Sequence, residues 1–230
     1  MLDIKNRWAL VTGASRGIGK QIAMALVEKG CHLVLHSRDN THTDALAKDL
    51  HSKGGQVIQL QAELSIHDQV VDLAHEAEHR SGGIDILYNN AAIMTPYRED
   101  YFSLAPQEYI DSFQVNTIAP ITLCNYLIPK MISRGFGRVI NVTSGIRNEP
   151  QLMPYAASKA ALDKYVVDMA GQLKGTGVLM NLLDPGWLRT DLGGPNAPNA
   201  VGSVIPGALV PALLEDDTSG KLFAAQEYRA

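Results

Sequence analysis

Two residues of the sequence, Tyr155 and Lys159, have the types and the spacing needed for proton transfer. Four residues apart on a helix, their side chains lie on one face. A lysine ammonium beside a phenol lowers the phenol's pKa, which is otherwise near 10 and too high for a base at neutral pH. Taken alone, such a pair more often belongs to a solvated helix surface. Its interpretation therefore depends on the other motifs of the chain.

A glycine-rich turn near the N-terminus is suited to binding phosphate. Thr12-Gly13-Ala14-Ser15-Arg16-Gly17-Ile18-Gly19 follows a short apolar run and leads directly into a helical pattern. Glycines at such a junction allow a tight turn and the close approach of a pyrophosphate, towards which the N–H groups and dipole of the helix point. A strand-to-helix turn also needs glycine for purely steric reasons. The position within the first strand–turn–helix unit favours a dinucleotide site.

The second apolar run ends in Leu35-His36-Ser37-Arg38, where dinucleotide-binding folds distinguish NAD from NADP. An acidic residue there bonds the ribose 2′-hydroxyl of NAD, whereas arginine suits the 2′-phosphate of NADP. Ser37 stands at the expected position of the carboxylate, and Arg38 and Arg16 supply two cations. The alternative is that both arginines are solvated surface residues. The sequence predicts NADP(H) as the preferred cofactor and NAD(H) as the less favoured one.

One further motif, His75-Glu76-Ala77-Glu78-His79, has the His-Glu-x-x-His pattern of zinc proteases. Val70, Ala74 and Ala77 mark the buried stripe of this helix, so both histidines lie elsewhere on its circumference. No third ligand follows at a convincing spacing. We interpret the segment as a polar surface helix and expect no metal site.

The elements that must position these residues alternate along the chain. Short apolar runs predict strands at 8–11, 32–36, 57–60, 84–88, 138–143 and 178–183. Segments of helical period lie between them, at about 17–29, 41–52, 66–80, 106–133 and 154–174. This alternation is typical of a parallel sheet buried on both faces. We therefore predict a single α/β domain over residues 1–230, a Rossmann-type doubly wound parallel sheet with helices on both faces.

The stretch 193–211 breaks this alternation, because it has four prolines, four glycines and no period. Such a composition indicates a loop or lid rather than a linker. We expect a substrate loop or lid at about residues 187–212.

Composition narrows the class of protein. The 230 residues carry 20 Lys+Arg and 24 Asp+Glu, a formal charge of −4, without a dense basic block, which argues against nucleic-acid partners. No apolar run approaches the length of about 20 residues that spans a bilayer, and the N-terminus has no signal-peptide core. Cys31 and Cys124 suit a reducing compartment. We expect a cytoplasmic protein with neither a nucleic-acid nor a membrane partner.

Taken in order, the motifs resemble those of the short-chain dehydrogenase/reductase family. The Gly-x-x-x-Gly-x-Gly spacing of residues 13–19 resembles that family's cofactor turn. The further matches, in chain order, are Asn89-Asn90-Ala91, Asn116, Ser144, Tyr155-Ala156-Ala157-Ser158-Lys159, Pro185-Gly186 and Thr190. The resemblance covers about residues 5–223 and depends on the motifs occurring together, since each one is common by chance.

The resemblance implies hydride transfer between a nicotinamide and a carbonyl carbon. Tyr155 would act as the general acid/base, and Lys159 would lower its pKa and hold the nicotinamide ribose. Ser144 would hydrogen-bond the substrate oxygen, and Asn116 would position a water that relays protons. Besides Tyr155 and Lys159, the implied cofactor contacts are Gly13, Ser15, Arg16, Gly17, Ile18, Gly19, Ser37, Arg38, Glu63, Leu64, Asn90, Ala91, Ala92, Pro185, Gly186, Leu188 and Thr190.

Three features depart from the family pattern. Ser144 lies eleven residues before Tyr155, two fewer than is usual in the family. The shorter loop 145–154 should therefore change the shape of the substrate pocket. Thr143 is a substitute for the Ser144 hydroxyl. Glu63 stands where the family usually has Asp beside the adenine. Ala92 stands where it usually has glycine.

We predict an NADP(H)-dependent oxidoreductase of the carbonyl reductase type, which the run 184–195 resembles most, with a small carbonyl compound or alcohol as substrate. Trp187 is expected over the nicotinamide or the substrate, or in a packing role. One alternative is a 3-oxoacyl-thioester reductase, which needs a groove for a pantetheine arm. Another is a non-catalytic NADP(H)-binding sensor or scaffold. The resemblance also implies a homodimer or homotetramer paired through helices 106–133 and 154–174.

Overall fold

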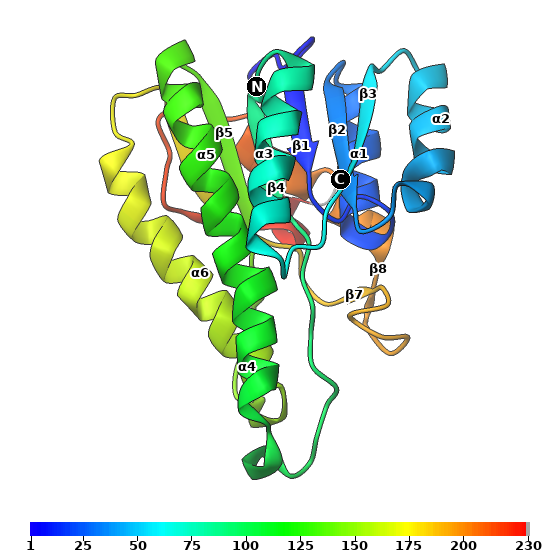
Figure 1. The fold of residues 1–230 in the computed structure, drawn as a ribbon, viewed down its shortest axis with the longest axis vertical. Helices are drawn as coiled ribbons and strands as arrows, with labels where there is room; N and C mark the ends of the chain where they lie inside the picture. The colour runs from blue at the N-terminus through cyan, green and yellow to red at the C-terminus, as the bar shows by residue number, and fades with distance from the viewer. Residues whose placement is uncertain (229–230) are drawn as a thin grey trace.

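A parallel β-sheet between two layers of helices forms the body of the computed structural model, which describes residues 1–228 (Figure 1). Seven strands stand in the order β3-β2-β1-β4-β5-β6-β9, and all neighbouring strands run parallel. They are β1 (Trp8–Val11), β2 (His32–Ser37), β3 (Val57–Gln61), β4 (Ile86–Asn89), β5 (Gly137–Val142), β6 (Val178–Asp184) and β9 (Leu222–Ala224). The predicted fold class, a Rossmann-type doubly wound sheet, is confirmed.

The helices form two layers around this sheet. On one face lie α1 (Gly17–Glu28) and α2 (Asp44–Ser52), and on the other lie α3 (His67–Ser81), α5 (Ala119–Arg134) and α6 (Met153–Gln172). A further helix, α4 (Pro106–Phe113), continues into α5 through a π-helical turn, Gln114–Ile118. Figure 1 shows α4 and the start of α6 projecting together beyond the sheet.

Burial on both faces explains why the strands are apolar throughout. Along β1, Ala9 and Val11 pack into the layer under α1, whereas Leu10 packs into the layer under α3 and α5. All three are fully buried. Side chains of a strand alternate between its faces, so two covered faces require an unbroken apolar run.

The predicted strands and helices agree with the structure to within a few residues, apart from one helix and the short strands after β6. The predicted helix 106–133 is divided into α4, the π-helical turn and α5. The strand β9 has only three residues and was not predicted; it becomes a strand by pairing with Leu182–Asp184 of β6.

The stretch predicted as a loop, 193–211, is partly ordered and packed. β8 (Asn199–Ala200) pairs with β7 (Leu188–Arg189), and 3₁₀ helices cover Val201–Val204 and Gly207–Ala212. Ala208, Leu209 and Ala212 are buried in the layer under α1. The exposed part of the predicted lid is therefore its first half.

The single domain of residues 1–230 stays a prediction, and its residues 229 and 230 lie outside the described part of the chain. Among residues 1–228, no helix combines the length and the apolar character that crossing a membrane requires.

Candidate active site

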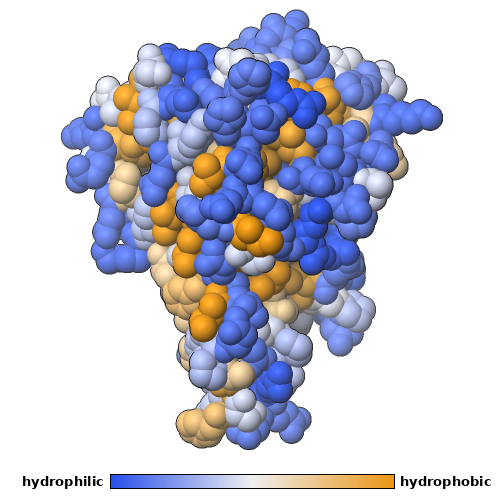
Figure 2. Space-filling model, in the orientation of Figure 1, coloured by the Kyte–Doolittle hydropathy of each residue, from blue (hydrophilic) through white to orange (hydrophobic). Residues whose placement is uncertain are grey.

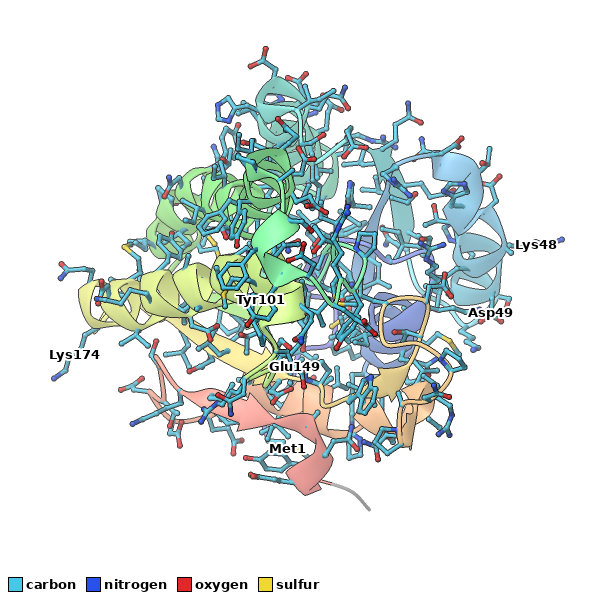
Figure 3. The ribbon with its side chains drawn as sticks, turned by 90° about the horizontal axis from the view of Figure 1, so that it is seen from below. Met1, Lys48, Asp49, Tyr101, Glu149 and Lys174 are labelled. Atoms are coloured by element: carbon cyan, nitrogen blue, oxygen red, sulfur yellow. The ribbon has the colours of Figure 1, made fainter. Side chains whose placement is uncertain are left out.

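The predicted site residues come together where the parallel strands end. The glycine-rich turn follows β1, Asn90 follows β4, Ser144 follows β5 and Pro185 follows β6. The sheet order reverses between β1 and β4, and open α/β sheets bind ligands in the crevice beside such a point. Figure 3 views the molecule from this side, with Tyr101 and Glu149 near the middle of the view.

The glycines of the turn allow its backbone to pack closely. A Cβ at Gly19 would lie 2.3 Å from the carbonyl oxygen of Gly13, and a Cβ at Gly13 would lie 3.0 Å from Cα of Ala91. Gly17 has φ of +57°, and its Cβ would lie 3.5 Å from Cγ2 of Thr190. The turn thus meets the loop after β4 on one side and the lid on the other.

Helix α1 offers its N-terminus to an anion. The N-cap residue of α1, Arg16, has an extended backbone and makes no side-chain capping bond. Among the described residues, the first turn of α1 contains no acidic side chain. The first N–H groups of a helix have no partner within the helix, and the helix dipole favours negative charge there. These residues fit the pyrophosphate of a dinucleotide, which Gly13, Ser15, Gly17, Ile18 and Gly19 would hold.

The side chain of Asn90 is hydrogen-bonded to the backbone of the glycine turn. Its Nδ2 donates to the carbonyl oxygens of Thr12, at 2.8 Å, and Gly13, at 3.3 Å. The hydroxyl of Thr12 in turn accepts from the N–H groups of Asn90 and Ala91. These bonds hold the glycine turn against the loop after β4, where Ala92 is half-buried.

The residues predicted to select the cofactor differ in exposure. Ser37 is buried and its hydroxyl donates to the carbonyl oxygen of Asp39 at 2.6 Å. Arg38 is exposed at the end of β2. Arg16 is also exposed, and its guanidinium pairs with the Asp191 carboxylate of the lid at 3.0 Å. Binding of a 2′-phosphate by Arg16 and Arg38 stays a prediction.

Two predicted contacts on the adenine side have other partners. The Glu63 carboxylate accepts the backbone N–H of Ser65 at 3.3 Å, which stabilises the turn after β3. Leu64 is buried in the apolar layer under α3. Leu188 is likewise buried in the layer under α1.

The proton-transfer pair is buried on α6. Tyr155 is 7% exposed and Lys159 is 3% exposed. The Lys159 ammonium donates to the carbonyl oxygen of Val142 at 2.7 Å and lies 6.0 Å from the centre of the Tyr155 ring. Ser144 follows β5 directly and lowers the pKa of the Tyr155 phenol through its hydrogen-bonding hydroxyl, and its Oγ accepts the N–H of Ile146 at 3.2 Å. The shortened loop therefore leaves Ser144 beside Tyr155.

The electrostatics of the pair favour a protonated tyrosine. Burial raises the pKa of Tyr155, the hydrogen bond with Ser144 opposes that shift, and the charges of Asp184 and Asp163 add to it. Burial lowers the pKa of Lys159 to about 8, against the opposing charge of Asp163. The pKa of Tyr155 thus shifts opposite to the predicted lowering, because burial disfavours the charged phenolate. The Tyr155 phenol is therefore protonated at neutral pH.

Asn116 holds two elements together from the π-helical turn. It is fully buried, and its Nδ2 donates to the carbonyl oxygen of Ile93 at 2.8 Å and to Oγ of Ser158 at 3.0 Å. Its Oδ1 accepts the N–H of Ile93 at 2.9 Å. The side chain fixes the loop after β4 to α6 beside Lys159, and the water relay stays a prediction.

Two carboxylates of the site were missed at the sequence level. Asp163 lies four residues after Lys159, so extending the Tyr155–Lys159 spacing by one helical step would have found it. Asp184 ends β6, and its Oδ1 accepts the N–H of Gly186 at 2.8 Å. A Cβ on Gly145 would lie 2.7 Å from its Oδ2, so this contact depends on glycine and has no signal in the sequence.

The lid has its own internal bonds. Trp187 is 59% exposed, and its Nε1 donates to the carbonyl oxygen of Gly193 at 2.7 Å. The Thr190 hydroxyl accepts the N–H of Gly193 at 3.0 Å. Gln226 donates to the carbonyl oxygen of Pro185 at 2.8 Å and so ties the start of the lid to the C-terminal segment. These bonds order the lid while the Trp187 ring stays exposed.

The zinc-protease pattern does not assemble a metal site. The rings of His75 and His79 stack with their centroids 6.2 Å apart, and His75 also meets the ring of Tyr126 edge-on. Within residues 1–228, no three His, Cys, Asp or Glu side chains cluster closely enough to hold a metal ion. His75, Glu76 and His79 are exposed on α3, whereas Ala77 is buried in the core.

Comparison with known proteins places the chain among related sequences. The family model described as short chain dehydrogenase matches residues 7–200. A short chain dehydrogenase of Pseudocercospora fijiensis is 32% identical over 198 residues, which cover 84% of this chain but only 63% of that relative, less than two thirds of its length. A 3-oxoacyl-[acyl-carrier-protein] reductase of Synechocystis is 33% identical over 188 residues, covering 80% of this chain and 75% of that protein.

A solved structure is similar over nearly the whole chain. The crystal structure of a gluconate 5-dehydrogenase of Burkholderia cenocepacia in complex with NADP and tartrate superposes with a TM-score of 0.85. The sequences are 27% identical, and the alignment covers 96% of this chain and 93% of that one.

Proposed function

This chain belongs to the short-chain dehydrogenase family of oxidoreductases, and from that premise we propose that it interconverts a carbonyl compound and a secondary alcohol with NADP(H). The observation that carries the proposal is the buried pair Tyr155 and Lys159 beside Ser144, at the strand ends next to the glycine turn. A buried ionisable pair in a crevice is typical of a catalytic site.

The side chains divide the chemistry among them. The bound dinucleotide supplies the hydride in reduction and accepts it in oxidation. The Ser144 hydroxyl bonds the substrate oxygen, and the Tyr155 O–H gives its proton to the oxygen as negative charge develops there, so that the C=O becomes CH–OH. Lys159 would hold the nicotinamide ribose, and its ammonium stabilises the developing charge.

NADP(H) is the proposed cofactor, with NAD(H) second. Arg16 and Arg38 are both exposed at the adenosine end, and Ser37 takes the position where a carboxylate would select NAD. The NADP bound to the Burkholderia dehydrogenase supports the same choice.

The proposed substrate is a small ketone, aldehyde or alcohol, as in carbonyl reductases. The run 184–195, which resembles carbonyl reductases, supports this choice, and the exposed Trp187 would supply an aromatic wall for such a substrate. A 3-oxoacyl thioester is the second candidate, favoured by the Synechocystis reductase. A non-catalytic sensor or scaffold is the least supported reading, because Tyr155, Lys159 and Ser144 are all in place.

A second copy of the chain is the proposed partner. Ile110 and Ile118 of the α4–α5 segment and Val167 of α6 are large apolar side chains that are 58%, 42% and 54% exposed. Figure 2 shows apolar residues among hydrophilic ones over these helices. Burying them in a homodimer or homotetramer would remove this apolar surface from water. The unpaired Cys31 and Cys124 support a reducing, cytoplasmic location.

The decisive experiment measures cofactor binding and turnover together. NADPH and NADH are titrated by fluorescence, and the loss of NADPH absorbance is followed with a panel of ketones, aldehydes and 3-oxoacyl thioesters. We expect NADPH to bind at least about tenfold more tightly and Tyr155→Phe to abolish turnover. Tighter NADH binding would contradict the cofactor proposal, and binding without turnover across the panel would favour the sensor.

A further inference from the structure

His36 is a fully paired histidine inside the cofactor-binding half of the molecule. It lies on β2 one residue before Ser37 and is 2% exposed. The Gly13 N–H donates to its Nδ1 at 3.2 Å, and its Nε2 lies 3.1 Å from the carbonyl oxygen of Ala62. Each ring nitrogen of His36 thus has a backbone partner within hydrogen-bond distance.

These two partners assign the protonation state of the ring. A backbone N–H can only donate, so Nδ1 has to be the unprotonated acceptor. A carbonyl oxygen can only accept, so Nε2 has to carry the hydrogen. The ring is therefore neutral and held as the Nε2–H tautomer. Burial lowers the pKa of His36 to about 4, while the Ala62 carbonyl and Glu63, the charged group that acts on the ring, oppose that shift.

The partners of His36 belong to two different parts of the dinucleotide site. Gly13 opens the glycine turn, and the next residue, Ala14, donates its N–H to the carbonyl oxygen of His36 at 2.9 Å. Two consecutive N–H groups of the turn are therefore held by one residue. Ala62 directly precedes Glu63 at the adenine side of the site.

We infer that His36 is a positioning residue for the cofactor. Its neutral ring hydrogen-bonds the phosphate-binding turn and the adenine-side loop and so fixes their relative positions. The inference rests on the proposed function, because it assumes that this turn binds a dinucleotide. Without the ring, the Gly13 N–H and the Ala62 carbonyl both lose a buried partner. The turn would then have to be ordered by the ligand, which weakens binding.

The tautomer is tested directly by NMR on the wild-type protein. Long-range ¹H–¹⁵N spectra of the imidazole rings are recorded from about pH 8 to about pH 5. Of the seven histidines, the signal lost in His36→Asn is expected to stay in the neutral Nε2–H form throughout. A ring that titrates in this range, or that carries its hydrogen on Nδ1, overturns the inference.

Three variants separate the two hydrogen bonds. His36→Asn keeps an acceptor near the position of Nδ1, His36→Gln keeps a donor near the position of Nε2, and His36→Leu keeps neither. We expect the Kd for NADPH to rise about tenfold in His36→Leu and less in the other two. The kcat at saturating NADPH should stay within about twofold of wild type, since the ring does not reach the reacting atoms.

His32 provides a matched control on the same strand. Its Nδ1 also accepts a backbone N–H, that of Gln56 at 3.3 Å, but at the opposite end of β2 from the site. His32→Leu should lower the thermal midpoint without changing the Kd for NADPH. A Kd of His36→Leu equal to that of His32→Leu overturns the inference. Failure of the wild type to bind NADPH would instead overturn the proposed function. The NMR experiment does not depend on NADPH binding, so the tautomer of His36 would still be known.

Discussion

The two ends of the candidate site are built in different ways. At the nicotinamide end, Tyr155 and Lys159 are 7% and 3% exposed, and the ammonium is fixed by a carbonyl oxygen of β5. At the phosphate end, the side chains of Arg16 and its partner Asp191 are 70% and 71% exposed. Proton transfer requires groups held within hydrogen-bond reach, which packed elements provide. Attraction of a phosphate tolerates mobile cations, because charge acts over several ångströms.

The largest expected effect is at the buried end. Tyr155→Phe removes the proton donor and keeps the ring, so kcat should fall by about a thousandfold. The Kd for NADPH should stay within about twofold of wild type, because the ring packing is unchanged. Steady-state kinetics and fluorescence titration measure the two quantities. Tyr126→Phe on α5, which lies beside His75 and Lys130, is the control and should leave both unchanged.

Gly19→Ala should disrupt the backbone framework that supports both ends. The new Cβ would lie 2.3 Å from the Gly13 carbonyl oxygen and 2.6 Å from Nδ2 of Asn90. Relieving that overlap costs about 2 kcal/mol and displaces the turn, so the Kd for NADPH should rise at least about tenfold. Thermal unfolding measures the loss of stability, and fluorescence titration measures the Kd for NADPH.

The matched control for that variant is Gly171→Ala, on α6. A Cβ there meets nothing within 4 Å, and alanine favours helix over glycine. Its stability should be unchanged or slightly higher and its Kd unaltered. Equal effects of the two variants would show that the close packing of the turn does not matter.

The pH dependence of turnover should report on Lys159. Its pKa is about 8, so the ammonium is charged below that value and activity falls as the pH rises through it. Asp163→Asn removes the carboxylate that favours the charged form, and the alkaline limb of kcat should move to lower pH by less than about one unit. The control is Asp168→Asn, an exposed carboxylate on the same helix that pairs with Lys164. Identical profiles for Asp163→Asn and wild type would contradict the assignment.

The same shift has a consequence for stability with a definite sign. The pKa of Lys159 is lower in the folded chain than its ordinary value of 10.5, so the unfolded chain binds more protons between about pH 8 and pH 10.5. The contribution of Lys159 to the free energy of unfolding should therefore rise with pH in this window. Denaturant titrations of wild type and Lys159→Met across the window measure it, and parallel curves would contradict it.

The smallest effects are expected at the exposed end. Arg16→Gln should weaken NADPH binding relative to NADH by about tenfold, through loss of the 2′-phosphate contact. Asp191→Asn should change the ratio of the two Kd values by less than about threefold, because exposed ion pairs contribute little. Titrations at low and high salt measure both. A larger effect for Asp191 than for Arg16 would mean that the lid carboxylate, not the cation, selects the cofactor.

Much of the fold was predictable because its periodicity is local. The strands and helices from Trp8 to Asp184 agree within a few residues with the alternation of apolar runs. The three residues of β9 were not predictable, since so short a run becomes a strand only through its pairing with β6. The same holds for the segment Gly207–Ala212, whose many small residues show no period yet pack under α1.

The candidate site divides in the same way. The spacing of Tyr155 and Lys159 on one helix and the glycines of the turn are local properties, and the sequence alone determined them. The contact of Asp184 with Gly145 and the hydrogen bonds of His36 and Asn116 join segments distant in the chain. The pKa of Tyr155 also depends on burial and on Asp184, which lies far from it in sequence. Only the tertiary structure decided these features, because hydrogen-bond partners and desolvation depend on distances that a linear pattern does not contain.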